Sequence, residues 1–546
     1  MGVRMQNTDF NRNLDVVIVG AGFSGLYMVH SMRNRGLKVK SFEKGNGVGG
    51  TWYWNRYPGA GSDIESLEYS YSFSEELQQE WKWKERYASQ PELEAYLEHV
   101  ADKFDLNKDI ELNVSVEEMV WMQDQAKWKV TLSTGEVISA KFMVMATGLL
   151  SSPKKVEFEG SDDFQGELYK TYNWPHEDVS FKGKKVGIIG TGSTAVQAIP
   201  IIAETADELF VFQRTPNFSA PRNNGPLDPE YENRVKAMYP EWREIQKNSF
   251  GGYVSVNFQP MFPNPNAGAD MSDEQILEEF EFRWKSGGLA FYTSFYDLLG
   301  NKDLNDKLGD FFRDKIRSKI KDPKKAEKLI PKDYPILTKR LCADTNYYET
   351  FNNDYVHIVD IKEDPIKRFI ANGVETQSKI YELDQIIIAT GFDAITGAMV
   401  NLDIKGIDGK ALAEEWGQGP RTNAGLMTNG FPNMFFVNGP GSCTGFFNPV
   451  LNVEYQGEWI GDLIDYMSNN NHSIVDSDVS GDDIWSEKMA EVARDTLFWG
   501  SNNWYIGANI DGKAQVMQLY LGGFPAYKEY TKELVDQNYR GFNFLN

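Results

Sequence analysis

The amino-acid sequence predicts an α/β protein with two parallel-sheet domains, the second inserted into the first, and with a helical insertion. Three observations support this fold class. Two glycine-rich loops, 20–25 and 190–195, each lie between an apolar strand and a helix. Two more apolar runs, 142–148 and 385–391, both end on Ala-Thr-Gly and mark where the chain crosses between the two domains. Between about 221 and 335, helical spacing replaces the strand pattern.

The length of 546 residues exceeds what one hydrophobic core usually supports. A composition of 41% apolar and 25% charged residues is typical of a globular chain. We expect the first domain to consist of 1–150 and 391–546, and the second of 151–220 and 336–390. The helical insertion is expected at 221–335.

The net charge of −23 argues against nucleic acid or an anionic membrane as a partner, because either would be repelled. A site for a phosphate-bearing cofactor must then be locally basic. The N-terminal stretch 1–14 carries no apolar signal core, and no run approaches a membrane span in length. These features predict a cytoplasmic protein.

The cysteine and histidine residues argue against disulfide exchange and against a metal site. Cys342 and Cys443 lie far apart and form no CxxC pair, which disfavours disulfide exchange and thiolate zinc sites. The five histidines show no HExxH or HxxxH spacing. We expect no metal.

The first glycine loop predicts a Rossmann-like unit that binds FAD. The strand 16–19 precedes Gly20-Ala21-Gly22-Phe23-Ser24-Gly25, and a helix from Leu26 through Met32 follows it, ending before Gly36. The helix N-terminus would face the pyrophosphate with its free N–H groups. The next strand, 39–42, ends on Glu43, whose carboxylate accepts hydrogen bonds from a ribose 2′-hydroxyl and repels a 2′-phosphate.

The second glycine loop predicts an NADPH site. The strand 185–189 precedes Gly190-Thr191-Gly192-Ser193-Thr194-Ala195, where alanine replaces the third glycine because that position needs only a small residue. The following strand, 209–212, ends on Gln213-Arg214-Thr215. A cation and a hydroxyl at this place favour a 2′-phosphate.

The helical insertion is predicted from two apolar stripes. Ser272 and Gln275 form a capping-box pattern ahead of the first stripe. The stripes are Ile276, Leu277, Phe280 and Trp284, and then Leu308, Phe312, Ile316 and Ile320. We expect them to pack in the core of an added subdomain.

The segment 49–63 contains Trp52, Tyr53, Trp54 and Tyr57 and is too aromatic for an ordinary surface loop, so we expect it to line the flavin. Together with 86–91, 212–216 and 503–505, it resembles the class B flavoprotein monooxygenases of the Baeyer-Villiger type. The similarity extends over nearly the whole chain.

The family fingerprint FxGxxxHxxxW, followed by proline or aspartate, matches at Phe164, Gly166, Trp174 and Pro175. Lys170 stands where the family has histidine. The resemblance implies that this segment links the two domains and that the histidine assists domain motion rather than chemistry. Lysine keeps a hydrogen-bond donor, so we expect the reaction class to survive and leave the effect on coupling open.

The resemblance implies an FAD-containing, NADPH- and O₂-dependent enzyme that converts aryl or cyclic ketones to esters or lactones through a C4a-peroxyflavin and a tetrahedral adduct. It also places Arg340 and Asp63 at the reaction centre, in a chain expected to act as a monomer. A guanidinium is always charged and stabilises the anions of this chemistry, while Asp63 would orient it. The alternatives are a solvated Lys339-Arg340 pair, and a Ser62/Glu65 capping box that puts Asp63 in a first helical turn.

The resemblance further implies that Lys339, Arg214 and Thr215 contact the 2′-phosphate of NADPH and that Trp504 contacts the nicotinamide ribose. Core packing is the alternative for Trp504. The full set of expected cofactor-binding residues is Gly20, Gly22, Gly25, Glu43, Gly50, Thr51, Trp52, Asp63, Tyr69, Gly190, Gly192, Ser193, Thr194, Arg214, Thr215, Lys339, Arg340 and Trp504. The loop 439–447 is expected to border the substrate, through Ser442, Cys443, Thr444, Phe446 and Phe447.

Three other functions stay open at this point. The first is an N- or S-oxygenating flavin monooxygenase. The second is a non-catalytic flavoprotein that binds both nucleotides. The third, a disulfide reductase with a similar two-nucleotide plan, is disfavoured by the missing cysteine pair.

Overall fold

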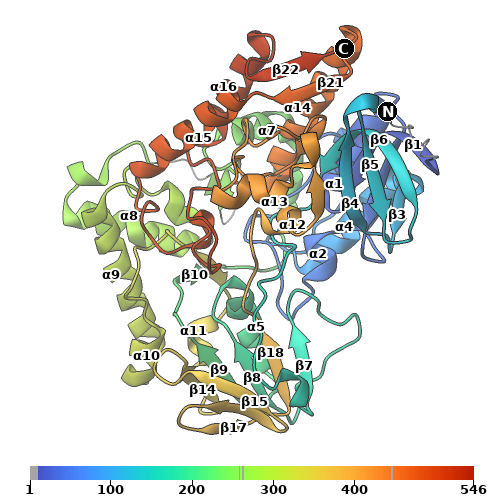
Figure 1. Ribbon diagram of the computed structural model, residues 1–546. Helices are drawn as coiled ribbons and strands as arrows, with labels where there is room; N and C mark the ends of the chain where they lie inside the picture. Colours follow the sequence, from blue (N-terminus) through green and yellow to red (C-terminus); the bar gives the residue numbers. More distant parts are fainter. Residues whose placement is uncertain (1–9, 257–258, 261–263, 444, 446) are drawn as a thin grey trace.

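The computed structural model describes residues 10–256, 259–260, 264–443, 445 and 447–546. Two sheets lie at opposite ends of the molecule, with α8, α9 and α10 of the insertion along one side and the C-terminal helices covering the first sheet (Figure 1). The first sheet has eight strands in the order β19-β4-β5-β6-β1-β2-β3, with β20 paired to β6. Its strands are β1 Arg12–Val19, β2 Val39–Glu43, β3 Ile110–Leu112, β4 Val116–Met122, β5 Lys127–Leu132, β6 Val137–Met145, β19 Asp403–Lys405 and β20 Met434–Phe436.

The second sheet has five strands in the order β14-β9-β8-β18-β7, all parallel. They are β7 Glu167–Lys170, β8 Lys185–Ile189, β9 Glu208–Gln213, β14 Val356–Asp360 and β18 Gln385–Ile388. Every strand of this sheet falls between β6 and β19 of the first sheet in the sequence. The predicted insertion of one dinucleotide-binding fold into the other is therefore confirmed.

The two glycine loops occupy equivalent places in the two sheets. The helix α1 (Phe23–Asn34) follows β1, and α5 (Ser193–Ala203) follows β8, each leading to the neighbouring parallel strand. Both helices have a glycine as N-cap, Gly22 and Gly192, which brings no capping side chain. α1 begins three residues earlier than predicted, because the last part of the glycine loop already forms its first turn.

The insertion is largely helical, as the stripes predict. Its helices are α6 Pro229–Ala237, α7 Tyr239–Asn248, α8 Asp273–Ser286, α9 Lys302–Lys319 and α10 Pro323–Leu329. Ser272 and Gln275 form the capping box at the start of α8. Leu308, Phe312, Ile316 and Ile320 are buried, as are Ile276 and Phe280, whereas Trp284 is half-buried. The expectation for Leu277 is wrong: it is 52% exposed, because one residue rotates a helix by about 100° away from the buried face of Ile276.

The alternative in which Ser62 and Glu65 cap a helix is also wrong. The Ser62 hydroxyl instead bonds Ile64 twice, donating to its carbonyl at 2.8 Å and accepting from its N–H at 3.0 Å. This local closure satisfies the groups that a helix start would leave open. Asp63 therefore lies on a non-helical segment, 57–63, which we call the strap. It runs next to the residues 86–90.

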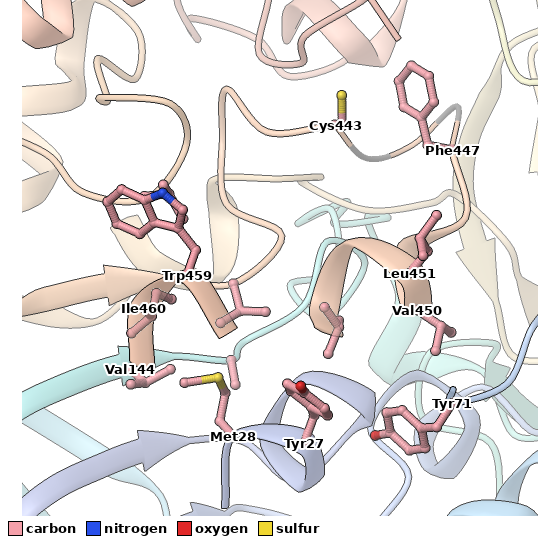
Figure 2. Packing of buried hydrophobic residues seen from close by; sticks show 14 of the residues in the cluster. Tyr27, Met28, Tyr71, Val144, Cys443, Phe447, Val450, Leu451, Trp459 and Ile460 are labelled. Carbon is pink, nitrogen blue, oxygen red and sulfur yellow. The ribbon is translucent and has the colours of Figure 1, made fainter. Parts of the chain in front are cut away.

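The first sheet is covered by the C-terminal part of the chain. Figure 2 shows Met28 and Tyr27 of α1 below Trp459 and Ile460 of α14, with Val144 of β6 beside them. The C-terminal elements are α14 Pro449–Asn469, α15 Val479–Arg494, α16 Phe524–Asp536, β21 Ile474–Ser477 and β22 Phe542–Leu545. The remaining elements are α2 Thr51–Trp54, α3 Glu75–Glu80, α4 Gln90–Lys103, α11 Tyr347–Thr350, α12 Gly397–Val400, α13 Leu412–Glu415, β10 Ser219–Pro221, β11 Ser255–Val256, β12 Gln259–Pro260, β13 Cys342–Asp344, β15 Ile366–Ile370, β16 Gly373–Thr376 and β17 Ile380–Glu382.

Within the described residues, none of the helices combines the length and the apolar character that crossing a bilayer demands.

Candidate active site

A single continuous cavity of about 2050 Å³ runs between the two sheets and is lined by both glycine loops. The predicted site residues that line it are Gly20, Gly22, Glu43, Gly50, Thr51, Trp52, Asp63, Tyr69, Gly190, Gly192, Ser193, Thr194, Arg214, Thr215, Lys339, Arg340, Phe447 and Trp504. Residues far apart in the sequence thus meet along one path. Two predicted substrate residues, Thr444 and Phe446, lie outside the described residues.

Glu43 is buried at the end of β2 and uses both carboxylate oxygens to hold its own loop. Oε2 accepts the N–H of Ala21 at 3.0 Å, and Oε1 accepts the N–H of Gly45 at 2.9 Å. An ionised carboxylate has about four acceptor sites, so two remain for ligand hydroxyl groups. The same carboxylate therefore shapes the loop and faces the cavity.

Gly25 does not line the cavity, which corrects its place among the cofactor contacts. A Cβ at this position would lie 1.9 Å from the carbonyl oxygen of Gly20. Only glycine lets the first turn of α1 approach the loop so closely. Its contribution is helix-to-loop packing behind the cavity wall.

The second nucleotide loop faces two cations. Arg214, just beyond β9, is exposed, and Lys339 is half-buried with its Nζ 4.2 Å from the centre of the Tyr334 ring. Burial lowers the pKa of Lys339, and the positive charge of Arg214 lowers it further, while Asp333 opposes the shift. Among the described residues, neither cation is in an ion pair. A dianionic phosphate between them would relieve their mutual repulsion.

Arg340 and Asp63 form a bidentate ion pair at the junction of the two halves. Nε donates to Oδ2 at 3.0 Å and Nη2 donates to Oδ1 at 2.9 Å, while Nη1 donates to the carbonyl of Gly445 at 2.8 Å. Burial lowers the pKa of Arg340, but the carboxylate of Asp63, together with Tyr292 and Tyr505, raises it overall. The guanidinium is held charged and in one orientation.

Aromatic side chains surround this ion pair. Tyr69 packs edge-on against Trp52, with ring centres 5.9 Å apart, and Tyr292 accepts the N–H of Leu341 at 3.3 Å. Burial raises the pKa of Tyr292 to about 12, and it also raises that of Tyr253. These two phenols stay neutral near pH 7 and add no charge beside the ion pair; of the aromatic residues named here, Trp52 and Tyr69 line the cavity itself.

Ser442 and Cys443 do not line the cavity, contrary to the sequence expectation. The hydroxyl of Ser442 donates to the carbonyl of Gly439 at 2.7 Å, and both residues are fully buried. Figure 2 shows Cys443 in the packed region near Phe447, which is buried in the same cluster but also reaches the cavity. The tight 439–442 turn directs these two side chains into the core.

The residues present fit two dinucleotides. Each helix start offers backbone N–H groups without a capping side chain, which suits a pyrophosphate. The first site adds the carboxylate of Glu43, and the second adds Arg214 and Lys339. The charge difference matches a ribose hydroxyl at one site and a 2′-phosphate at the other.

Comparison with known proteins agrees with this geometry. The Baeyer-Villiger monooxygenase of Pseudooceanicola batsensis is 38% identical over 545 residues, which cover 99% of this chain and 98% of that protein. The crystal structure of OTEMO in complex with FAD and NADP superposes with a TM-score of 0.93 at 39% identity, covering 97% of this chain and 99% of that one. The chain belongs to the Baeyer-Villiger monooxygenase family. It is an NADPH-dependent flavoprotein monooxygenase with FAD as its flavin.

A relative within this range of similarity has a different name. The phenazine N-monooxygenase PhzNO1 of Lysobacter antibioticus is 38% identical over 536 residues, which cover 97% of each protein. Membership of the Baeyer-Villiger family therefore leaves the oxidised atom of the substrate to be decided.

The family model described as pyridine nucleotide-disulphide oxidoreductase matches residues 17–252. This range contains both glycine loops, so the match reflects the shared nucleotide-binding folds. Cys342 and Cys443 are both free and buried, and burial raises the pKa of each thiol. They do not form the cysteine pair that disulfide exchange requires. Among the described residues, no group of three His, Cys, Asp or Glu side chains is arranged to hold a metal ion.

The family fingerprint spans β7, the edge strand of the second sheet, and the residues on both sides of it. Lys170, which replaces the family histidine, is the last residue of β7, is exposed, and does not line the cavity. Trp174 is buried against Tyr169, with ring centres 5.2 Å apart. The positions that match the fingerprint anchor this edge strand.

Sequence reasoning missed two residues that hold the strap 57–63, Gln197 and Arg222. The hydroxyl of Tyr57 donates to the amide oxygen of Gln197 at 2.8 Å, and the amide nitrogen of Gln197 donates to the carbonyl of Gly61 at 3.0 Å. Arg222 donates to the carbonyl of Ser62 at 2.7 Å. Gln197 comes from α5 and Arg222 follows β10, so no local sequence signal links them to this strap.

Proposed function

We propose that this member of the Baeyer-Villiger family converts ketones, aryl or cyclic, to esters or lactones, with O₂ as the second substrate. The observation that carries the proposal is the bidentate pair of Arg340 and Asp63 in the cavity between the two nucleotide loops. When bound, FAD takes up hydride from NADPH and activates O₂, which is chemistry that side chains do not supply.

The role we propose for Arg340 is to hold negative charge on oxygen while the carbonyl carbon of the substrate is attacked. Its charge is permanent, and Asp63 and the Gly445 carbonyl fix its orientation before substrate arrives. A preorganised cation in a buried site stabilises developing charge without reorganisation at the moment of reaction. Asp63 acts by orienting Arg340.

The cofactor contacts are part of the same proposal. Glu43 would accept hydrogen bonds from the hydroxyl groups of the FAD ribose. Arg214, Thr215 and Lys339 would bind the 2′-phosphate of NADPH. All four residues line the same cavity, Glu43 at the first glycine loop's sheet and the others at the second, which supports this assignment. Trp504 also faces the cavity and remains our candidate for the nicotinamide ribose.

An apolar substrate is supported by the residues next to Asp63. Ile64 and Tyr69 line the cavity there and are packed with Leu289, Tyr253 and Tyr292 in one small apolar cluster. Phe447 contributes a further aromatic surface to the cavity. Such walls favour a ring or an aryl group and position its carbonyl by exclusion of water.

N-oxygenation is a second candidate function, because the relative PhzNO1 is named as a phenazine N-monooxygenase. The two functions separate by product. Equal amounts of protein are given phenylacetone or cyclohexanone in one set of reactions and phenazine in the other, with NADPH, and products are identified by mass. An N-oxide without ester or lactone would replace the ketone proposal.

The proposed role of Arg340 is tested by Arg340→Ala. We expect flavin reduction by NADPH to continue while ester formation falls by about 10²-fold or more, the size of losing a preorganised donor. Arg35→Ala is the matched control, because the Arg35 side chain is also 16% exposed and ion-paired but follows the end of α1 as its C-cap and does not line the cavity. Ester formation at the control level in Arg340→Ala would remove the central assignment.

We also propose the domain limits expected from the sequence: 1–150 with 391–546, 151–220 with 336–390, and 221–335. The strands of the two sheets fall within the corresponding ranges, which supports these limits. A monomeric, cytoplasmic protein completes the proposal. Light scattering of the holoprotein and cell fractionation test these two points.

A further inference from the structure

A short two-stranded sheet brings two arginines to the strap that carries Asp63. β10 and β13 pair in parallel, from Ser219 with Cys342 to Pro221 with Asp344. Arg340 lies two residues before the start of β13, and Arg222 directly follows β10. The two side chains therefore approach residues 61–63 of the strap from opposite ends of this short sheet. Its strands are three residues long, about 10 Å at 3.3 Å per residue.

The two arginines hold different parts of the strap. Arg340 binds the carboxylate of Asp63, whereas Nη2 of Arg222 donates to the backbone carbonyl of Ser62 at 2.7 Å and to that of Tyr87 at 3.4 Å. Arg222 is only 7% exposed, and among the described residues its Nε has no hydrogen-bond acceptor. Its guanidinium is buried on carbonyl groups rather than on a carboxylate.

The strap fits closely around Arg222. A Cβ on Gly61 would lie 2.5 Å from Nη2 of Arg222 and 2.9 Å from the carbonyl oxygen of Ala88. On its other side the strap is bonded to the residues 88–90, through Ser62 N–H to Ala88 and Gln90 N–H to Ala60. Ser62 is thus fixed by contacts on both sides, and Asp63 is the next residue.

Arg222 is also electrostatically linked to Asp63. Burial lowers the pKa of Arg222, and Asp63 is the strongest of the charged neighbours that oppose this shift. An arginine buried without a direct carboxylate partner is costly in a fold. That cost is understandable if the residue has a role beyond stability.

We propose that Arg222 is a positioning residue for the reaction centre: by fixing the carbonyl of Ser62, it sets the direction in which Asp63 presents its carboxylate to Arg340. The inference rests on the proposed function of Arg340 and Asp63. Arg222 itself contacts neither the cavity nor a reacting atom. The β10–β13 sheet then aligns both arginines with one short stretch of backbone.

The test uses FAD-loaded Arg222→Gln, with the rate of flavin reduction by NADPH and the ester formed per NADPH consumed measured separately on a ketone. We expect flavin reduction within about twofold of the parent and a roughly 10- to 100-fold fall in ester per NADPH, the size of effect that a misplacement near 1 Å produces. In Arg222→Lys, one ammonium group can still donate to both carbonyls, because a single nitrogen of Arg222 makes both bonds. We expect Arg222→Lys to recover most of the lost ester yield per NADPH consumed, which we call coupling.

Arg243→Gln is the matched control. Arg243 is 5% exposed and bonds the Glu68 carbonyl and the side chains of Gln78, Ser70 and Gln246, so its loss also leaves buried acceptors unpaired. Coupling should fall in Arg222→Gln and stay at the parental level in Arg243→Gln, at similar losses in unfolding temperature. Equal coupling in the two variants, whether both high or both low, overturns the inference.

A crystal structure of the Arg222→Gln holoprotein supplies a readout that does not depend on turnover. We expect the Ser62 carbonyl to have moved and the bidentate Asp63–Arg340 pair to be broken or single; an unchanged pair overturns the inference. If Arg222→Gln does not fold, Gly61→Ala perturbs the same contact and is measured in the same way against Arg222→Lys. Ester formation that survives in Arg340→Ala defeats the proposed function, whereas normal coupling in Arg222→Gln alongside an inactive Arg340→Ala defeats only this inference.

Discussion

The two nucleotide units share one backbone plan but treat their charged residues differently. In the first unit, Glu43 is buried and both of its oxygens hold backbone N–H groups of the same unit. In the second, Arg214 is exposed and Lys339 is half-buried, and the two repel one another. The first charge is part of the fold, whereas the second pair is left for a ligand to neutralise. A charge at the end of such a strand can thus serve the structure, as that of Glu43 does, or be left to bind a ligand, as we propose for Arg214.

The largest effect is expected at Gly25, the third glycine of the first loop, because the second loop has Ala195 at the equivalent position. Gly25→Ala would put a methyl group 1.9 Å from the Gly20 carbonyl, and neither backbone segment can yield cheaply. We expect no FAD-loaded protein. The equivalent position of the second loop already carries a buried alanine, so Ala195→Gly should cost only about 1 kcal/mol. Flavin absorbance after purification and thermal unfolding measure both variants. A flavin-loaded, parent-like Gly25→Ala would show that the two loops are equally permissive.

The cation pair predicts an intermediate effect that is confined to one cofactor. Lys339→Ala and Arg214→Ala would each remove one of the proposed charge-assisted contacts to the 2′-phosphate, worth about 1.5–3 kcal/mol. NADPH should then bind roughly 10- to 100-fold more weakly, while NADH binding, flavin content and unfolding temperature stay near parental values. Stopped-flow reduction at varied NADPH and NADH gives the two affinities. An unchanged preference in Lys339→Ala would assign the discrimination to Arg214 and Thr215 alone.

The pKa of Lys339 predicts the smallest effect. Because burial and Arg214 lower this pKa, Lys339 loses its proton at a lower pH than an ordinary lysine does. The preference for NADPH over NADH should therefore decline as the pH rises toward the alkaline range, and should be fullest below it. Lys339→Arg keeps its charge at every accessible pH and should flatten the decline. The ratio of the two dissociation constants from pH 7 to pH 9.5 measures this effect. Parallel profiles for the parent and Lys339→Arg would mean that Lys339 stays charged throughout.

Sequence reasoning found the cavity-lining residues that stand at the end of a strand or in a glycine loop. Glu43 and Arg214 end their strands, and strand direction alone brings them to the same edge of a sheet as the glycine loops. It was less successful in the loop 439–447, where Ser442 and Cys443 turn into the core, while Phe447 is the one predicted substrate residue among the described residues that lines the cavity. Side-chain direction in such a turn depends on packing against distant segments. No periodicity encodes it.

The amino-acid sequence by itself determined the α/β class, the insertion of one nucleotide fold into the other, and the opposite charges at the two strand ends, because these follow from local periodicity and from the chemistry of single positions. The tertiary structure alone decided that Asp63 lies on a strap rather than in a helix, that Arg340 binds it in bidentate fashion, and that Arg222 supports the same strap. Those contacts join residues more than 150 positions apart. They form only when the two sheets and the helical insertion have packed, so no stretch of sequence contains the information in local form.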